Sequence, residues 1–263
     1  MKRILCSLMF CCLLGLSQPV LSAKPIPVLN AHAAILMDQA TGKVLYAKNS
    51  RAIMAPASTT KIMTAVLVLE QLNLNRTVRV GDVSWEGTSL NLVRGERKTV
   101  LELLYGLMLV SGNDAASVLA KTIAGTETAF ARLMTEKARL IGMRNTVFKN
   151  ASGLPVIGHY TTAYDLAILT RFAMRKPTFQ KIVKTKYFKI SGSKPGTVRN
   201  LKNHNKLLWK YHYTTGVKTG YTVNAGGCLV ASASYQGRSL IAVVLKTKTI
   251  YDDCIKLFKY GFS

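Results

Sequence analysis

The stretch Pro56-Ala57-Ser58-Thr59-Thr60-Lys61 leads directly into the apolar run Ile62-Met63-Thr64-Ala65-Val66-Leu67-Val68-Leu69. The uniformly apolar run predicts a buried helix, and Ser58 lies where that helix should begin, at the positive end of its dipole. Lys61 follows three residues later, a spacing that brings both side chains to one helix face. A lysine in apolar surroundings can be neutral near pH 7 and activate a serine hydroxyl. A helix cap followed by a solvated lysine is the competing interpretation.

Two later motifs favour the catalytic interpretation. Ser111-Gly112-Asn113 lies at a tight corner between two expected helices, and Lys218-Thr219-Gly220 lies on an expected strand. Together the motifs supply the residue types of a serine/lysine acyl-transfer site, in the order Ser-x-x-Lys, Ser-x-Asn, Lys-Thr-Gly. Such a site needs no metal, no cofactor and no histidine. The chain has no Gly-x-Ser-x-Gly nucleophile elbow, and its four histidines lie in no strong triad context: His32, His159, His204 and His212.

The N-terminal segment has the three parts of a secretory signal. Lys2-Arg3 precedes an apolar segment from Ile4 to about Leu16, and the small residues Ser22-Ala23 follow. Ser17-Gln18-Pro19 interrupts the apolar segment short of the ~20 residues that a membrane span needs. We therefore expect residues 1–23 to be a signal peptide. The mature chain should be exported, to the periplasm or to the outer face of the cytoplasmic membrane.

The remaining residues, 24–263, are enough for one large domain with a substantial core. The chain has a net charge of +24, an excess that often marks nucleic-acid binding. Export argues against nucleic acid as a partner, and so do the scattered basic residues without interleaved aromatic ones. We expect attraction to the anionic cell envelope surface instead, with a merely soluble basic surface as the alternative.

Two cysteines remain in the expected mature chain, Cys228 and Cys254. An oxidising compartment would allow them to pair in a disulfide. Two buried thiols, packed by a strand and a helix, are the interpretation we favour.

Strand patterns occur at both ends of the mature chain, and helix patterns lie between them. The expected strands cover residues 33–38, 43–47, 216–218, 228–234 and 239–246, and a last helix covers 251–260. The middle helices begin at Thr99, at Asn113 or Asp114, at Thr126 and at Thr162. Both chain ends should therefore meet in one central antiparallel sheet with an inserted helical lobe, a mixed α/β (α+β) fold.

With these motifs in place, the sequence resembles the penicillin-binding serine D-Ala-D-Ala peptidases, and within them the low-molecular-mass D-alanyl-D-alanine carboxypeptidases. The resemblance covers nearly the whole mature chain. Besides the three motifs, it is carried by residues 33–38, 42–45, 145–150, 153–155, 162–165, 216–222 and 260–262. It implies the β-lactamase/D-Ala-D-Ala peptidase-like fold, peptidoglycan stem peptides as substrates and β-lactam antibiotics as acylating inhibitors.

The resemblance also implies catalytic roles. Ser58 would be the nucleophile, acylated while the terminal D-alanine leaves, and neutral Lys61 would be the base that takes its proton. Ser111 would pass a proton toward the leaving D-alanine, and Lys218 would supply positive charge beside Ser111.

Substrate-binding roles follow from the same resemblance. Asn113 would hold the peptide amide of the substrate, and Thr219 would bind its terminal carboxylate. The backbone N–H groups of Ser58 and Tyr221 would form the oxyanion hole. Gly220, in the Lys-Thr-Gly motif, would also belong to the substrate-binding residues.

This chain departs from the family at the carboxylate-binding position, and it differs from class A β-lactamases in one loop. Many relatives carry an arginine shortly before the last helix that helps to bind the substrate carboxylate, whereas Lys246 and Lys248 are the candidates here. A lysine offers a point charge in place of a bidentate guanidinium. The loop over residues 145–160 carries no glutamate to activate a deacylating water.

Two alternatives to the carboxypeptidase stay open at this point. The same chemistry can cleave peptidoglycan cross-links, which would make the protein a D-Ala-directed endopeptidase. A catalytically idle envelope-binding module is the other alternative, and the presence of Ser58, Lys61, Ser111 and Lys218 argues against it.

Overall fold

The computed structural model describes residues 24–82 and 86–263. The expected signal peptide, residues 1–23, lies outside the described residues. A five-stranded antiparallel sheet forms the centre, in the order β2-β1-β9-β8-β7. These strands are β1 (Ala33–Asp38), β2 (Val44–Lys48), β7 (Thr214–Thr222), β8 (Gly226–Tyr235) and β9 (Arg238–Thr247). Because β1 pairs with β9, the two chain ends meet in one sheet, and the predicted architecture is confirmed.

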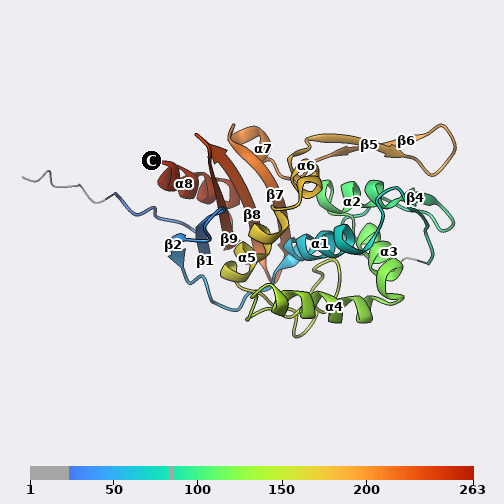
Figure 1. Ribbon diagram of the computed structural model, residues 1–263, viewed down its shortest axis with the longest axis horizontal. Helices are drawn as coiled ribbons and strands as arrows, with labels where there is room; N and C mark the ends of the chain where they lie inside the picture. The colour runs from blue at the N-terminus through green and yellow to red at the C-terminus, as the bar shows by residue number, and fades with distance from the viewer. Residues whose placement is uncertain (1–23, 83–85) are drawn as a thin grey trace, which may run out of the picture.

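Helices cover both faces of this sheet (Figure 1). The helix α8 (Ile250–Phe262) packs on one face, and the helical lobe packs on the other. The lobe contains α1 (Lys61–Gln71), α2 (Val100–Leu109), α3 (Asn113–Ala124), α4 (Glu127–Leu140), α5 (Ala163–Ala173) and α6 (Pro177–Lys184). Successive side chains of a strand point to opposite faces, so β8 contributes Val230 to the lobe side and Leu229 to the α8 side.

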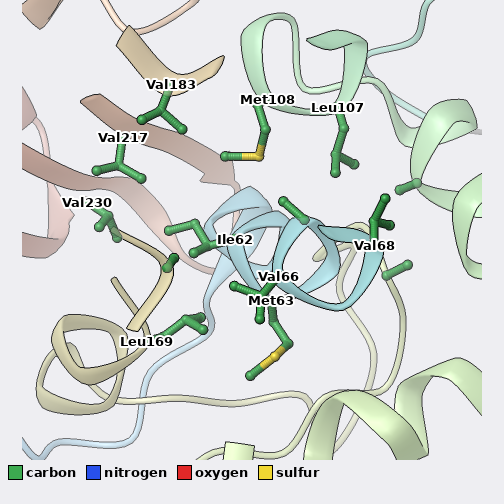
Figure 2. Packing of buried hydrophobic residues seen from close by; sticks show 14 of the residues in the cluster. Ile62, Met63, Val66, Val68, Leu107, Met108, Leu169, Val183, Val217 and Val230 are labelled. Atoms are coloured by element: carbon green, nitrogen blue, oxygen red, sulfur yellow. The ribbon is translucent and has the colours of Figure 1, made fainter. Parts of the chain in front are cut away.

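Helix α1 is the centre of the larger core (Figure 2). Residues 61–68 are all buried, as the uniformly apolar run predicts. Figure 2 shows Ile62, Met63, Val66 and Val68 surrounded by side chains from α2, α5, α6, β7 and β8: Leu107, Met108, Leu169, Val183, Val217 and Val230. Full burial of each such side chain stabilises the fold by about 1.5–3 kcal/mol. The start of α1 is thereby fixed against β7, the strand that carries the Lys-Thr-Gly motif.

Side-chain caps fix the starts of three lobe helices as predicted. Thr99 forms a complete capping box with Glu102 at the start of α2. Thr126 and Thr162 accept hydrogen bonds from backbone amides three residues later, at the starts of α4 and α5. Each cap satisfies an amide that the helix itself leaves without an acceptor.

The prediction that Asn113 or Asp114 caps α3 was wrong. Gly112 is the N-cap residue and makes no side-chain cap, so Asn113 is the first helical residue. The Asn113 side chain bonds to Lys61 instead. The Asp114 carboxylate accepts hydrogen bonds from the backbone amide of Leu90. Both side chains therefore bind groups outside α3, although Asp114 also accepts a hydrogen bond from the backbone amide of Ala115 within it.

Several shorter elements were not predicted. They are β3 (Thr77–Arg79), β4 (Arg97–Thr99), β5 (Tyr187–Ser191), β6 (Val198–Lys202) and α7 (Leu207–Lys210), together with α6. The β5–β6 hairpin is tied to β4 by a buried ion network. Glu96 pairs with Lys98 at 2.6 Å and with Arg199 at 2.5 Å. Burial acts to raise the pKa of Glu96, but hydrogen bonds from Arg199 and Lys98 outweigh it and lower this pKa to about 2.

Cys228 and Cys254 are free, buried thiols, as we predicted. They belong to the two separate cores on opposite faces of the sheet, so the sheet itself keeps them apart. Within residues 24–82 and 86–263, every helix is too short or too polar to cross a membrane.

Candidate active site

Ser58 lies in a short 3₁₀ turn, η1 (Ala57–Thr60), directly before α1. The expected start of a helix is confirmed, but Ser58 makes no cap, because no side chain caps the turn or α1. Ala57 has φ 47°, in the left-handed region. A Cβ on Gly153 would lie 1.9 Å from the Ala57 carbonyl oxygen, so only glycine permits this approach. The loop of residues 145–160 therefore packs against the turn and supports its strained backbone.

Lys61 is fully buried directly below Ser58. Its Nζ lies 3.1 Å from Ser58 Oγ, 2.6 Å from Asn113 Oδ1 and 2.6 Å from the Ser152 carbonyl oxygen. Burial lowers the pKa of Lys61 well below its usual range, and the positive charge of Lys218 lowers it further, while Asp114 acts in the opposite direction. The surroundings thus favour the neutral amine, the form that can accept a proton.

The corner between α2 and α3 places Ser111 and Asn113 beside this pair. Ser111 is buried and, like Ala57, lies in the left-handed region, with φ 64°. The Thr88 hydroxyl donates to the Ser111 carbonyl at 2.8 Å, and the Asn113 backbone amide donates to the Thr88 carbonyl at 2.8 Å. The Asn113 side-chain amide donates to the Glu86 carbonyl. The segment from Glu86 to Leu90 therefore holds the corner in place.

Strand β7 forms the other wall of the site. Lys218 is buried, and burial lowers its pKa to about 7. Its Nζ donates to the Thr219 carbonyl at 3.0 Å. A Cβ on Gly220 would lie 2.9 Å from the Ser58 backbone nitrogen and 3.1 Å from Ala57 Cβ. Glycine at this position is what allows β7 to approach the serine turn so closely.

An open cavity of about 1350 Å³ lies above these residues. Of the predicted site residues, Ser58, Ser111, Thr219, Gly220 and Tyr221 line the cavity. The other three, Lys61, Asn113 and Lys218, are buried. Lys246 and Lys248, the candidates for the place of the expected arginine, also line it. The structure therefore brings all eight predicted residues to one place.

Sequence reasoning missed three residues at the site. Ser152 contributes only its backbone carbonyl, which carries no signal in the residue type. Thr88 lines the cavity and supports Ser111 through a loop contact that local patterns do not reveal. His204 also lines the cavity; burial and the charge of Lys218 lower its pKa. Among residues 24–82 and 86–263, no group of three or more His, Cys, Asp or Glu side chains is placed to hold a metal ion.

A serine hydroxyl in contact with a buried lysine, beside an open cavity, defines the class of serine acyl-transfer enzymes. A family model described as D-alanyl-D-alanine carboxypeptidase, peptidase family S11, matches residues 20–249. The chain belongs to this family, as the resemblance implied.

Curated relatives agree with this assignment. The chain is 39% identical to the D-alanyl-D-alanine carboxypeptidase DacF of Bacillus subtilis over 245 residues, which cover 89% of the chain and 62% of DacF. It is 36% identical to the D-alanyl-D-alanine carboxypeptidase of Streptomyces sp. K15, covering 90% of the chain and 89% of that enzyme. The chain thus spans less than two thirds of DacF but most of the Streptomyces enzyme.

Solved structures show the same fold. The Streptomyces K15 DD-transpeptidase matches with a TM-score of 0.85 at 35% identity, covering 90% of the chain and 98% of that structure. A D-alanyl-D-alanine carboxypeptidase from Mycobacterium tuberculosis matches with a TM-score of 0.86 at 32% identity, covering 90% and 93%. The predicted β-lactamase/D-Ala-D-Ala peptidase-like fold is therefore confirmed.

Proposed function

We propose that this protein is a serine D-alanyl-D-alanine carboxypeptidase that removes the terminal D-alanine from peptidoglycan stem peptides. Ser58 attacks the carbonyl of the D-Ala-D-Ala bond, D-alanine leaves, and water hydrolyses the resulting Ser58 ester. The observation that carries this proposal is the contact between the buried Lys61 Nζ and Ser58 Oγ beside the open cavity. Family membership supports it.

The contacts of Lys61 suit a base. A neutral lysine amine has two N–H donors and one lone pair. The two shortest contacts, at 2.6 Å each, are with the Asn113 side-chain oxygen and the Ser152 carbonyl, which can only accept. The lone pair is then left for the third neighbour, the Ser58 hydroxyl proton. Asn113 and Ser152 would orient the amine toward the nucleophile.

Charge stabilisation would come from β7 and the serine turn. The backbone N–H groups of Ser58 and Tyr221 would form the oxyanion hole, and the close approach of Gly220 to the Ser58 nitrogen supports this pairing. Losing one such donor costs about 2.7–4 kcal/mol of transition-state stabilisation. Ser111 would pass a proton to the leaving D-alanine, and protonated Lys218 would keep positive charge beside it.

The substrate would be held at its two ends. Thr219 would bind the terminal carboxylate, and Lys246 and Lys248 line the same cavity with additional positive charge. Asn113 would hold the peptide amide by exchanging its present contact with the Glu86 carbonyl for one with the substrate.

The same geometry should accept β-lactam antibiotics, because a lactam carbonyl and its carboxylate imitate the D-Ala-D-Ala terminus. We place the activity in one catalytic domain over residues 24–263, following a signal peptide over residues 1–23. Export to the periplasm or the outer face of the cytoplasmic membrane brings this domain to its substrate. Its net charge, +22 once Lys2 and Arg3 are removed from the +24 of the whole chain, attracts it to an anionic envelope surface.

Product analysis by mass tests the proposal. Purified protein is incubated with a monomeric pentapeptide fragment of peptidoglycan, with a cross-linked dimer, and with the monomer plus a free amine acceptor. Loss of one D-alanine from the monomer, abolished in Ser58→Ala, supports the carboxypeptidase. Cleavage of the dimer alone would make the protein an endopeptidase, and exclusive transfer to the amine would make it a transpeptidase. If the protein is folded and reacts with penicillin but releases no product from any of these fragments, the proposed substrate is wrong.

A further inference from the structure

Acidic residues are unevenly distributed along the chain. Residues 166–251 contain 16 lysines and arginines and no aspartate or glutamate, so all 12 acidic residues lie elsewhere. This acid-free segment includes the β5–β6 hairpin and α7. The positive charges of that region therefore have no carboxylate in their own segment to neutralise them.

The hairpin and α7 present a group of exposed lysine and aromatic side chains, which we name the hairpin patch. It consists of Lys186, Tyr187, Lys189, Lys202, Trp209 and Lys210. Tyr187 and Lys202 are direct partners across the hairpin. In the part of the chain that the structure describes, none of the four lysines takes part in an ion pair. Figure 1 shows the hairpin extending away from the central sheet, at the edge of the molecule.

The ammonium groups of two patch lysines lie near one aromatic ring. Lys186 Nζ lies 5.6 Å from the centre of the Trp209 ring, and Lys202 Nζ lies 5.8 Å from the same ring. The Tyr187 ring packs edge-on against Trp209, with ring centres 5.8 Å apart. Cation–π attraction of this kind is weakly favourable at an exposed site. Two like charges are thus held near one ring, an arrangement that a bound anion would stabilise.

The patch continues to the candidate active site. Lys210 Nζ lies 5.5 Å from the centre of the Tyr251 ring, and both residues line the cavity that contains Ser58. An extended anion on the hairpin can therefore follow the lysines to the edge of the cavity.

We propose that the hairpin patch binds a flexible polymer of phosphodiester groups belonging to the cell envelope. A chain of phosphates matches the spaced ammonium groups along the hairpin by charge complementarity. A lipid bilayer matches less well, because the apolar part of its binding needs rings that enter the membrane interface, and two ammonium groups lie against Trp209. This inference deepens the envelope attraction proposed above by naming its surface and its ligand class.

The test compares two triple variants with equal loss of charge. The patch variant is Lys186→Gln, Lys189→Gln and Lys202→Gln, none of which lines the cavity. The control variant is Lys43→Gln, Arg132→Gln and Lys259→Gln, three exposed basic residues beside β2 and on α4 and α8. Binding of soluble poly(glycerol phosphate) is measured over a series of salt concentrations.

The wild-type protein should bind the polymer with an affinity that falls as salt rises. Each lost phosphate contact makes the negative slope of log affinity against log salt shallower by about 0.7. The slope of the patch variant should therefore be shallower than that of wild type by about 2. Its affinity should fall at least about tenfold at low salt, while the control variant stays within about twofold of wild type.

Three results would overturn the inference: equal losses in the two variants, no binding by the wild type, or tighter binding to phosphatidylglycerol vesicles at equal phosphate concentration. Acylation by benzylpenicillin is measured on every sample as a check of the fold. Because polymer binding does not depend on acylation, failure of this inference is distinguishable from failure of the proposed function.

Discussion

The contact between Gly220 and the serine turn gives the sharpest quantitative prediction. In Gly220→Ala, the new Cβ would lie 2.9 Å from the Ser58 nitrogen, 3.1 Å from Ala57 Cβ and 3.2 Å from the Thr59 nitrogen. Favourable contacts between such atoms lie near 3.5–4.0 Å, so β7 and the turn must separate by roughly 0.5 Å or more. This shift moves the two proposed oxyanion donors apart. The loss of one donor costs about 2.7–4 kcal/mol, a factor of roughly 10²–10³ in rate.

The assay is the second-order rate constant for acylation by a fluorescent penicillin, measured together with thermal unfolding. Gly220→Ala should slow acylation about 100-fold and destabilise the fold by about 1–3 kcal/mol through overpacking. Gly81→Ala is the matched control, because a Cβ at Gly81 meets nothing within 4 Å. An acylation rate constant of Gly220→Ala within about threefold of the wild-type value would refute the proposed oxyanion hole, because the added Cβ must move its two donors apart.

Other predictions concern the lysines of the site. Lys61→Arg should abolish acylation because arginine cannot lose its proton, whereas Lys218→Arg should retain a measurable part, and equal losses would contradict the two roles. In wild type, acylation should slow as the pH rises past about 7, where Lys218 loses its charge; a Lys218→Arg variant that keeps this alkaline decline would show that another group causes it. Replacing both Lys246 and Lys248 by alanine should slow acylation about tenfold if they bind the carboxylate, and an unchanged rate would exclude them.

Local signals predicted much of the fold. The capping box at Thr99 and the caps at Thr126 and Thr162 depend on residues three positions apart, so a short window of sequence contains the whole interaction. The buried helix α1 was equally predictable, because no exposed face places polar residues within its apolar run. The central sheet followed from strand patterns at the two chain ends.

The β5–β6 hairpin was missed because tertiary contacts define it. Each strand buries only one residue, Ile190 in β5 and Leu201 in β6, so the local strand pattern is weak. The ion network of Glu96, Lys98 and Arg199 that holds the hairpin joins parts of the chain about 100 residues apart. No local pattern reports such a network.

At the site, residue types were predictable but backbone geometry was not. The Ser-x-x-Lys spacing anticipated the contact of Ser58 with Lys61, yet the 3₁₀ turn in place of a helix cap depends on Gly153 packing against Ala57 from a distant loop. The left-handed backbone of Ser111 is likewise a product of its surroundings. The Ser152 carbonyl orients Lys61 without any requirement on its side chain.

The central claim is that Ser58 is the nucleophile, and locating a penicillin adduct tests it most directly. After addition of excess benzylpenicillin, intact-mass measurement should show one equivalent bound, and peptide mapping should place it on Ser58. Ser58→Ala should show no adduct. The ester should persist for minutes or longer, an order-of-magnitude lifetime, because residues 145–160 contain no carboxylate to position a hydrolytic water. An adduct on another residue, or rapid turnover of the drug without any adduct, would contradict the account.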